Sequence, residues 1–384
     1  MEQTTLLRAV SCADDYDPNS MPVAKAREWI RAFLKPVDAS ERVHIRASLG
    51  RILAEDLVSP IDVPGHDNSA MDGYALRFDD LEKDKVTLLK MIGTSFAGRP
   101  FEGKAGAGKC VRIMTGGVMP AGTDTVVMQE RTEAKGDAVH IEAGVKRGQN
   151  VRAAGEDLRV GQVVFKTGQA LRAAELGMIA SLGIGEITVY RRLRVAFFST
   201  GDELRSIGSA LGTGQLYDSN RYTLYGMLTH LGCDVMDLGV VRDDPRALEE
   251  TLTRAAAMAD VVITSGGVSV GEADYTKELL SRLGEVLFWK IAMKPGRPLA
   301  YGKIGNTHFF GLPGNPVSVM VTFYQFVRDA LLILMGRAGV TPLPTLKARC
   351  TSALKKAPGR TEFQRGLLSQ QAGGDWTVKV TGEQ

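Results

Sequence analysis

The chain has 384 residues, enough for two or three domains, each with a sizeable core. Its 44% hydrophobic and 24% charged residues exclude collagen-like, coiled-coil and wholly disordered classes. The net charge of +3 is spread evenly along the chain, without the basic stripes that track a polyanion, so a nucleic acid is not expected as a partner.

Cysteine spacing and the N-terminus indicate the compartment. The cysteines at 12, 110, 233 and 350 lie about a hundred residues apart and form no CxxC or zinc-type cluster. Residues 1–17 contain no apolar core of a signal peptide, and we expect no stretch with the ~18 apolar residues of a membrane span. We therefore predict a reduced, cytoplasmic protein with no membrane partner.

The first half of the chain changes character twice. Residues 21–35 have apolar positions at helical spacing, and Pro36 ends that helix. From about 86 to 168 the pattern becomes short β-type runs separated by glycine and acidic turns. Residues 170–182 return to the helical period and lead to a strand in GEITVYRR.

From Leu193 onward, apolar strands alternate with helices: LRVAFFS, DVMDLGVV, DVVITS and THFFGL each precede a helical stretch. Repeated β–loop–α units predict a parallel sheet covered on both faces, with ligands at the carboxyl ends of its strands. The Pro-rich TPLPTLKARC then opens a short β-like tail.

We therefore predict a multidomain α/β fold: a β-rich insertion domain, a doubly wound α/β domain with a parallel-type sheet, and a small C-terminal β domain that is incomplete. The expected boundaries are 1–60 with 155–190 for an extended linker and dimerisation domain, 61–154 for the β-rich domain, 191–340 for the α/β domain and 341–384 for the C-terminal domain.

The strongest motif is a glycine loop, TSGGVSVGEAD, between a strand and a helix. Glycines let backbone N–H groups face an anion, and a helix N-terminus adds its positive dipole, so a phosphate-like group is expected here. The binding residues predicted in this loop are Ser265, Gly266, Gly267, Ser269 and Gly271. The alternative is a tight turn in which Asp274 only starts the helix.

A second loop, GLPGNPVS, also joins a strand to a helix and predicts oxyanion binding by Pro313, Gly314, Asn315 and Ser318. Simple helix capping is the alternative.

Three cations border a Pro/Gly turn between the two loops: Lys290, Lys294 and Arg297. Together these features predict a site for a phosphorylated substrate and a second anion. A solvated surface position is the alternative for Lys290.

Acidic residues follow other strands: Asp202, Glu203, Asp218, Asp243 and Asp244. Carboxylates at several strand ends, placed near phosphates, would hold a hard ion such as Mg²⁺. Asp-Asp-Pro is also an ordinary helix cap, so capping and function both stay open for that pair, and the same holds for Asp218 in Asp-Ser-Asn.

In the first half, three segments are turns with no chemistry of their own by residue pattern: DNSAMDGYA, MTGGVMPAG and GEDL.

Taken in order with the loops above and with STGDEL, YDSNR, LGVVRDDP, FWKIAMKPGRP and GRTEFQRG, they resemble the molybdopterin molybdenumtransferase family, which includes MoeA and the E domains of gephyrin and plant Cnx proteins. The likeness spans nearly the whole chain. It implies that adenylyl-molybdopterin and molybdate give molybdenum cofactor and AMP, with Mg²⁺ as cofactor.

The resemblance also implies residue roles. Asp72, Thr115 and Asp157 match functional positions of the first half. In the α/β domain, the matching active-site positions are Glu203, Asp243, Asp274, Lys290 and Lys294. The first three of these are expected to handle metal and phosphate, and Lys290 to contact the pterin. Ser318 and Arg365 match positions that line a molybdate pocket beside Lys294.

Partners follow from the same resemblance. We expect a homodimer in which Asp72 and Thr115 of one subunit serve the α/β domain of the other. A molybdopterin adenylyltransferase is the expected pathway partner, and apo-molybdoenzymes or their chaperones would receive the product. The chain also resembles the stand-alone bacterial type, without the adenylylating domain of gephyrin.

Two other classes of protein are the alternatives to this enzyme. A non-catalytic scaffold, as E-type domains can also be, would be free to lose the acidic and basic site residues, which are retained here. A nucleotide-dependent oxidoreductase would show GxGxxG followed by an acidic residue about 20 positions on, and neither occurs.

Overall fold

The computed structural model describes residues 20–267, 274–356 and 358–382. The chain forms two compact units. Unit 1 comprises residues 1–55, 167–177 and 185–384, and unit 2 comprises 56–166 and 178–184. The predicted β-rich segment 61–154 falls entirely within unit 2.

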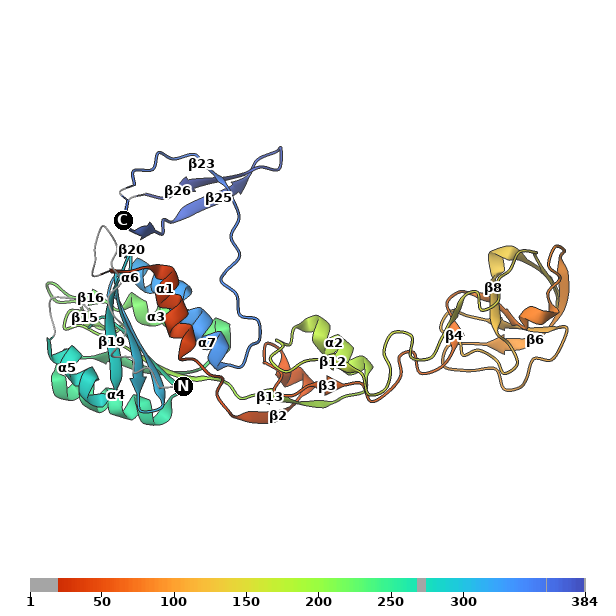
Figure 1. Cartoon of the computed structure of the whole chain (residues 1–384), viewed down its shortest axis with the longest axis horizontal. Helices are drawn as coiled ribbons and strands as arrows, with labels where there is room; N and C mark the ends of the chain where they lie inside the picture. Colours follow the sequence, from red (N-terminus) through yellow and green to blue (C-terminus); the bar gives the residue numbers. More distant parts are fainter. Residues whose placement is uncertain (1–19, 268–273, 357, 383–384) are drawn as a thin grey trace. The chain divides into compact units, whose positions relative to one another are not determined.

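Unit 1 is built on a seven-stranded sheet in the order β1-β19-β21-β22-β18-β14-β17 (Figure 1). The strands are β1 (Ser20–Met21), β14 (Arg194–Thr200), β17 (Asp234–Val241), β18 (Val261–Ser265), β19 (Glu285–Ile291), β21 (Pro298–Ile304) and β22 (Thr307–Leu312). Neighbouring pairs are parallel except where β21 meets β19 and β22. The predicted parallel-type sheet is therefore interrupted at β21. The connections on either side of β21, 292–297 and 305–306, are too short for a crossover.

Helices cover both faces of this sheet, as the doubly wound prediction requires (Figure 1). One face carries α1 (Val23–Ala32), α3 (Ser219–Leu231), α6 (Pro316–Thr322), a π-helix (Phe323–Val327) and α7 (Arg328–Leu334). The other carries α4 (Pro245–Met258) and α5 (Asp274–Leu283). Strand β14 shows why both are needed: Val195 and Phe197 pack in the first core, Ala196 and Phe198 in the second. A strand buried on both sides reads as a continuous apolar run.

One helical stretch meets a length-and-composition test for a membrane span, although Gln325, Arg328 and Asp329 interrupt its apolar run. By length and composition, Pro316–Leu334 passes that test, with a mean hydropathy of 1.5. Val319, Phe323, Val327 and Leu331 are buried in the core of unit 1. A core helix of this kind passes the same test, so the stretch is weak support for a membrane span.

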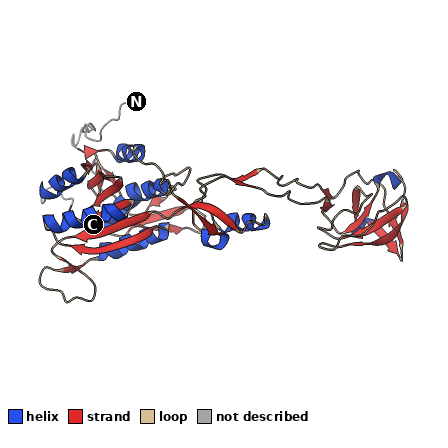
Figure 2. Ribbon diagram, turned by 90° about the horizontal axis from the view of Figure 1, so that it is seen from below, coloured by secondary structure: helices blue, strands red, loops and turns tan. Residues whose placement is uncertain are grey.

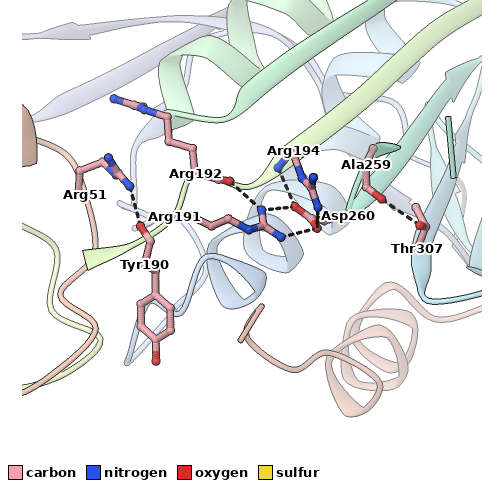
Figure 3. Close-up of polar contacts among 8 residues, drawn as sticks. All are labelled: Arg51, Tyr190, Arg191, Arg192, Arg194, Ala259, Asp260 and Thr307. Carbon is pink, nitrogen blue, oxygen red and sulfur yellow. Dashed lines mark hydrogen bonds and ion pairs between the residues drawn. The ribbon is translucent and has the colours of Figure 1, made fainter. Parts of the chain in front are cut away.

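At the opposite edge of the sheet from its carboxyl ends, Asp260 gathers donors from the chain that enters β14 (Figure 3). Arg191 Nη1 and Nη2 donate to its two oxygens at 2.7 Å each, and the Arg194 backbone N–H donates at 2.9 Å. Arg51 Nη2 donates to the Tyr190 carbonyl at 2.8 Å. These contacts fix the start of β14 to the antiparallel pair β2 (Ser40–His44) and β13 (Glu186–Tyr190).

The regular elements of unit 2 are mostly short strands joined by loops (Figure 2). Its main sheet has the order β8-β5-β7-β6-β10-β9. These strands are β5 (Gly73–Leu76), β6 (Thr87–Ser95), β7 (Lys109–Ile113), β8 (Thr125–Met128), β9 (Thr132–Lys135) and β10 (Ala138–Ile141). Tyr74, Leu76, Leu89, Val127 and Val139 are buried in its core. This confirms the predicted succession of short β runs.

Shorter elements complete the two units. The helices are η2 (Ile45–Ser48), η3 (Phe78–Asp80), η4 (Gln129–Arg131) and α2 (Ala173–Ser181). Two-stranded pairs are β3 (Leu57–Val58) with β12 (Val163–Phe165), β4 (Asn68–Ser69) with β11 (Val151–Arg152), β15 (Leu204–Arg205) with β16 (Leu216–Tyr217), and β20 (Met293–Lys294) with β24 (Thr361–Glu362). The predicted β tail forms a sheet of β23 (Arg349–Cys350), β26 (Trp376–Val380) and β25 (Gly366–Gln370).

Candidate functional site

The loops singled out in the sequence meet at the carboxyl edge of the seven-stranded sheet. In the parallel register Thr200 lies opposite Val241, and Ser265 lies opposite both Ser199 and Leu312. The loops that follow β14, β17, β18 and β22 are therefore neighbours. This is the edge at which open α/β sheets bind ligands.

The glycine loop after β18 is pressed against the end of β14. Gly266 and Gly267 have φ of +90° and +69°. A Cβ at Gly266 would lie 2.4 Å from the Thr200 carbonyl oxygen, and one at Gly267 would lie 2.8 Å from Thr200 Cγ2. Close packing and left-handed backbone thus require glycine here, independently of any anion. Ser269 and Gly271 lie outside the described residues, as does the loop up to the start of α5 at Asp274.

In the loop after β22, the capping alternative holds for Asn315. Its Oδ1 accepts the Val317 N–H at 3.0 Å and the Ser318 N–H at 3.5 Å, with Pro316 in the first turn. Pro313 and Ser318 are buried, whereas Gly314 is exposed. Asn315 therefore caps α6, and any ligand contact by this side chain would have to coexist with that role.

The Asp-Asp-Pro segment divides its two roles between its two carboxylates. Asp244 Oδ1 accepts the Ala247 N–H at 2.8 Å and caps α4, which starts at Pro245. Asp243 instead accepts a short hydrogen bond from Thr200 Oγ1 across the strand ends. Capping therefore explains Asp244 but not Asp243, which faces the loop after β14.

Glu203 folds back over its own turn. Its carboxylate lies over Gly201, whose φ of +153° is the feature that favours glycine at this turn. Among the described residues, no group of three or more His, Cys, Asp or Glu side chains is placed to hold a metal ion. The predicted metal set of Glu203, Asp243 and Asp274 includes one residue, Asp274, whose side chain the structure does not describe.

The three predicted cations take different positions around β19 and β21. Lys290, half-buried near the end of β19, lies opposite Pro298 in β21 and Ser20 in β1. Arg297 Nη2 donates to Ser20 Oγ at 3.3 Å, so part of this guanidinium serves β1. Lys294 is exposed on β20, and its peptide bond to Pro295 is cis.

Lys294 and Arg365 are brought together at a cavity of about 870 Å³. Strand β20 pairs with β24, so that Lys294 lies opposite Glu362 and the following turn carries Arg365. Lys355 and Lys356 also line the cavity, which therefore presents four cations and one carboxylate. Ser318 is not among its lining residues, although its carbonyl oxygen lies 3.6 Å from where a Cβ of Gly296 would be.

Sequence reasoning missed both of these lysines. The signal that could have found them is their position directly before the GRTEFQRG segment, where a basic pair precedes the turn that carries Arg365.

In unit 2, Asp72 and Thr115 form one cluster although they are 43 residues apart in sequence. Asp72 Oδ1 accepts both the Thr115 N–H and the Thr115 Oγ1 hydrogen at 2.7 Å. The pKa of Asp72 is lowered, first by the Thr115 N–H bond and then by the hydroxyl bond. The register of β5 and β7 explains the meeting, because Gly73 lies opposite Ile113 and the two residues leave the sheet at the same end.

Asp157 lies on a separate turn of unit 2. Its Oδ2 accepts from Arg152 Nη2 at 2.6 Å, and the same arginine also pairs with Glu156. The structure therefore places Asp157 in an exposed ion-pair group rather than with Asp72.

Comparisons with known proteins agree with this geometry. Residues 21–183 match the MoeA N-terminal region (domain I and II), and 196–332 match a probable molybdopterin binding domain. A molybdopterin molybdenumtransferase from Haemophilus influenzae is 46% identical over 90% of this chain and 85% of its own length. One from a Nostoc species is 40% identical over 78% and 70%. A crystal structure of a molybdopterin biosynthesis moeA protein from Pyrococcus horikoshii has a TM-score of 0.82 at 29% identity, covering 95% and 90%.

A shared succession of both regions, with the same fold, defines the class: an enzyme of the MoeA type. The chain belongs to the molybdopterin molybdenumtransferase family, the transferases of molybdenum cofactor biosynthesis. The resemblance stated from the sequence motifs is confirmed.

Proposed function

We propose that this protein converts adenylyl-molybdopterin and molybdate to molybdenum cofactor and AMP. Family membership supports the transfer of molybdenum to a pterin. The observation that carries the proposal furthest is the cationic cavity shared by Lys294 and Arg365. It supplies what a small, doubly charged oxyanion needs, close to a sheet edge suited to a phosphorylated ligand.

The chemistry of the cavity fits a tetrahedral oxyanion. Arginine offers a rigid fork of donors that matches two oxygens, and lysine adds a mobile point charge. Lys294 is held on paired backbone, because the Thr361 N–H donates to the Ala292 carbonyl and the Phe363 N–H to the Lys294 carbonyl, both at 2.8 Å. The proposed role of these cations is to hold molybdate while the dithiolene sulfurs of the pterin take up the metal.

The phosphate groups of the substrate are assigned to the glycine loop. Gly266 and Gly267 turn the chain at the end of β18 with positive φ, and α5 begins beyond the loop at Asp274; the Gly266 N–H already donates to the Leu312 carbonyl at 3.0 Å, so it is not one of the proposed anion donors. Backbone N–H groups and a helix N-terminus bind anions by hydrogen bonds and dipole. Lys290 is proposed to contact the pterin, Gly314 to border the same region, and Ser318, as the resemblance implies, to belong to the molybdate site although it does not line the cavity described above.

The need for Mg²⁺ is proposed from the resemblance and from the oxygen ligands of Glu203 and Asp243. Among the described residues, the carboxylates alone do not gather into a metal site. AMP release should stop in EDTA and return when Mg²⁺ is added. Activity that persists without divalent ions would exclude this requirement.

We propose a cytoplasmic homodimer that receives substrate from a molybdopterin adenylyltransferase and passes its product to apo-molybdoenzymes or their chaperones. Mixing D72N and D243N proteins should restore part of the activity that each lacks alone. If the subunits are shown to have exchanged and no activity returns, a site shared between subunits is refuted.

The deciding experiment measures AMP release and pterin-bound molybdenum with and without molybdate. The variants K294M and R365M should raise the KM for molybdate roughly tenfold or more, the size of a lost charge-assisted hydrogen bond. K347M is the matched control, because Lys347 is exposed and does not line the cavity. Molybdate-independent AMP release, or equal KM values in all variants, would refute the proposal.

A further inference from the structure

One buried side-chain amide contacts both the glycine loop after β18 and the loop after β22, at the carboxyl edge of the sheet. Asn220, in the first turn of α3, is 7% exposed. Its Nδ2 donates to Ser265 Oγ at 2.8 Å and to the Gly314 carbonyl at 2.6 Å. Ser265 ends β18 directly before the two glycines, and Gly314 lies in the loop after β22. One side chain thus contacts both loops, 45 and 94 residues away in sequence.

The contact is built into the fold rather than carried by a mobile surface group. Asp218 caps α3 by accepting the Arg221 N–H at 3.1 Å, which fixes the first turn and hence the position of Asn220. Ser265 is 1% exposed. The loops also touch through backbone, since a Cβ at Gly314 would lie 3.9 Å from Gly266 Cα. Small changes in their separation would therefore move Gly266 and Gly267.

The two ends of the Asn220 amide, the Nδ2 donor and the Oδ1 acceptor, are satisfied differently. Both Nδ2 hydrogens have an acceptor, whereas Oδ1 is buried with no hydrogen-bond partner in the described part of the chain. A buried acceptor without a partner costs free energy, so a residue selected for stability alone would favour a different side chain. The donor pair is the property that this position uses. Aspartate has no such donor, and serine is too short to reach both acceptors.

We propose that Asn220 is a positioning residue that sets the spacing between the chain at 265–267, after β18, and the chain at 313–315, after β22, for the phosphorylated substrate. The inference rests on the proposed function for the identity of that substrate. The cationic cavity contains none of these residues, so the molybdate subsite should be unaffected. A purely structural role would instead reduce the amount of active protein and leave both KM values unchanged.

The kinetic test uses the full-length protein and the variants N220A, N220D and S265A. In N220A and N220D, the KM for adenylyl-molybdopterin should rise roughly tenfold, while the KM for molybdate stays within twofold. S265A should reproduce part of the effect, and N220A combined with S265A should be less than additive. Unchanged KM values for both substrates, or equal rises in both, would overturn the role of Asn220.

A second measurement is independent of activity. Hydrogen–deuterium exchange in N220A should be faster in peptides covering 261–267 and 311–317, and unchanged at 349–356 beside the cavity. Equal exchange in wild type and variant would refute the positioning role. If N220D does not fold, S265A and N220A still decide the question. Wild-type protein without molybdate-dependent AMP release would refute the proposed function, and the exchange experiment would still test Asn220.

Discussion

Acid should weaken unit 1 through one buried histidine. His308, in β22, is 6% exposed, and its Nδ1 lies 3.4 Å from the Tyr301 hydroxyl oxygen. Burial, and to a smaller extent the charge of Lys303 directly opposite in β21, lower the pKa of His308 from 6.5 to about 4. The folded state therefore keeps this ring neutral where the unfolded chain takes up a proton.

The sign and size of the effect follow from linkage. Because the folded pKa lies below the unfolded one, the contribution is complete above pH 6.5 and is lost as the pH falls toward about 4. One pKa unit is worth about 1.4 kcal/mol, so the free energy of unfolding should drop by roughly 2 to 3 kcal/mol between pH 7.5 and 4.5 from this residue alone.

The assay is urea unfolding at both pH values, followed by fluorescence of Trp289, whose ring centroid lies 6.0 Å from that of Tyr301. H308Q keeps an amide near the Tyr301 hydroxyl but cannot be protonated. The free energy of unfolding of this variant should therefore fall less than that of wild type between pH 7.5 and 4.5. H230Q is the matched control, because His230 is exposed at the end of α3. If wild type and H308Q lose equal stability, the reasoning about His308 is wrong.

Three further outcomes test other parts of the structure. D260N should lower the free energy of unfolding by roughly 1 to 3 kcal/mol in chemical denaturation, because Asp260 is the shared acceptor at the start of β14. The control E250Q, which removes one partner of the exposed Arg246–Glu250 ion pair, should change it by less than about 0.5 kcal/mol. Equal effects of the two substitutions would contradict this prediction. G73A should destabilise unit 2, since the new Cβ would lie 2.0 Å from the Val127 carbonyl oxygen; a melting temperature equal to wild type would show that the strands can separate. T115V removes the hydroxyl bond to Asp72 but keeps the N–H bond, so the pKa of Asp72 should rise part of the way toward its ordinary value in an NMR titration; no movement would mean that the Thr115 hydroxyl does not lower it.

Local chemistry explains what the sequence could predict. The strand and helix positions from Leu193 onward follow from apolar runs and from caps such as Asp218 and Asp244, which act on neighbouring residues. The choice between Asp243 and Asp244 as the cap was open, yet Pro245 at the first helical position already favours Asp244. The direction of β21 was not anticipated, because a hairpin with a six-residue connection resembles a loop in a one-dimensional pattern.

Long-range geometry explains what the sequence could not predict. The contact of Asn220 with Ser265 and Gly314 depends on which strands are neighbours, and no local rule gives that order. The Asp72–Thr115 pair was named only through the family resemblance, and the register of β5 and β7 supplies its physical reason. The roles assigned to both residues remain predictions.

The short pairing of β20 with β24 has a thermodynamic consequence. Lys294 lies on one side of that pairing and Arg365 follows the other, so the cavity forms only while the C-terminal segment is docked. An anion that binds both cations therefore stabilises the docked state, by an amount that grows with the anion concentration relative to its Kd. The oxyanion concentration then sets how much of the C-terminal segment is docked. At high oxyanion concentration residues 349–382 are protected from proteases, and at low concentration they are cleaved faster.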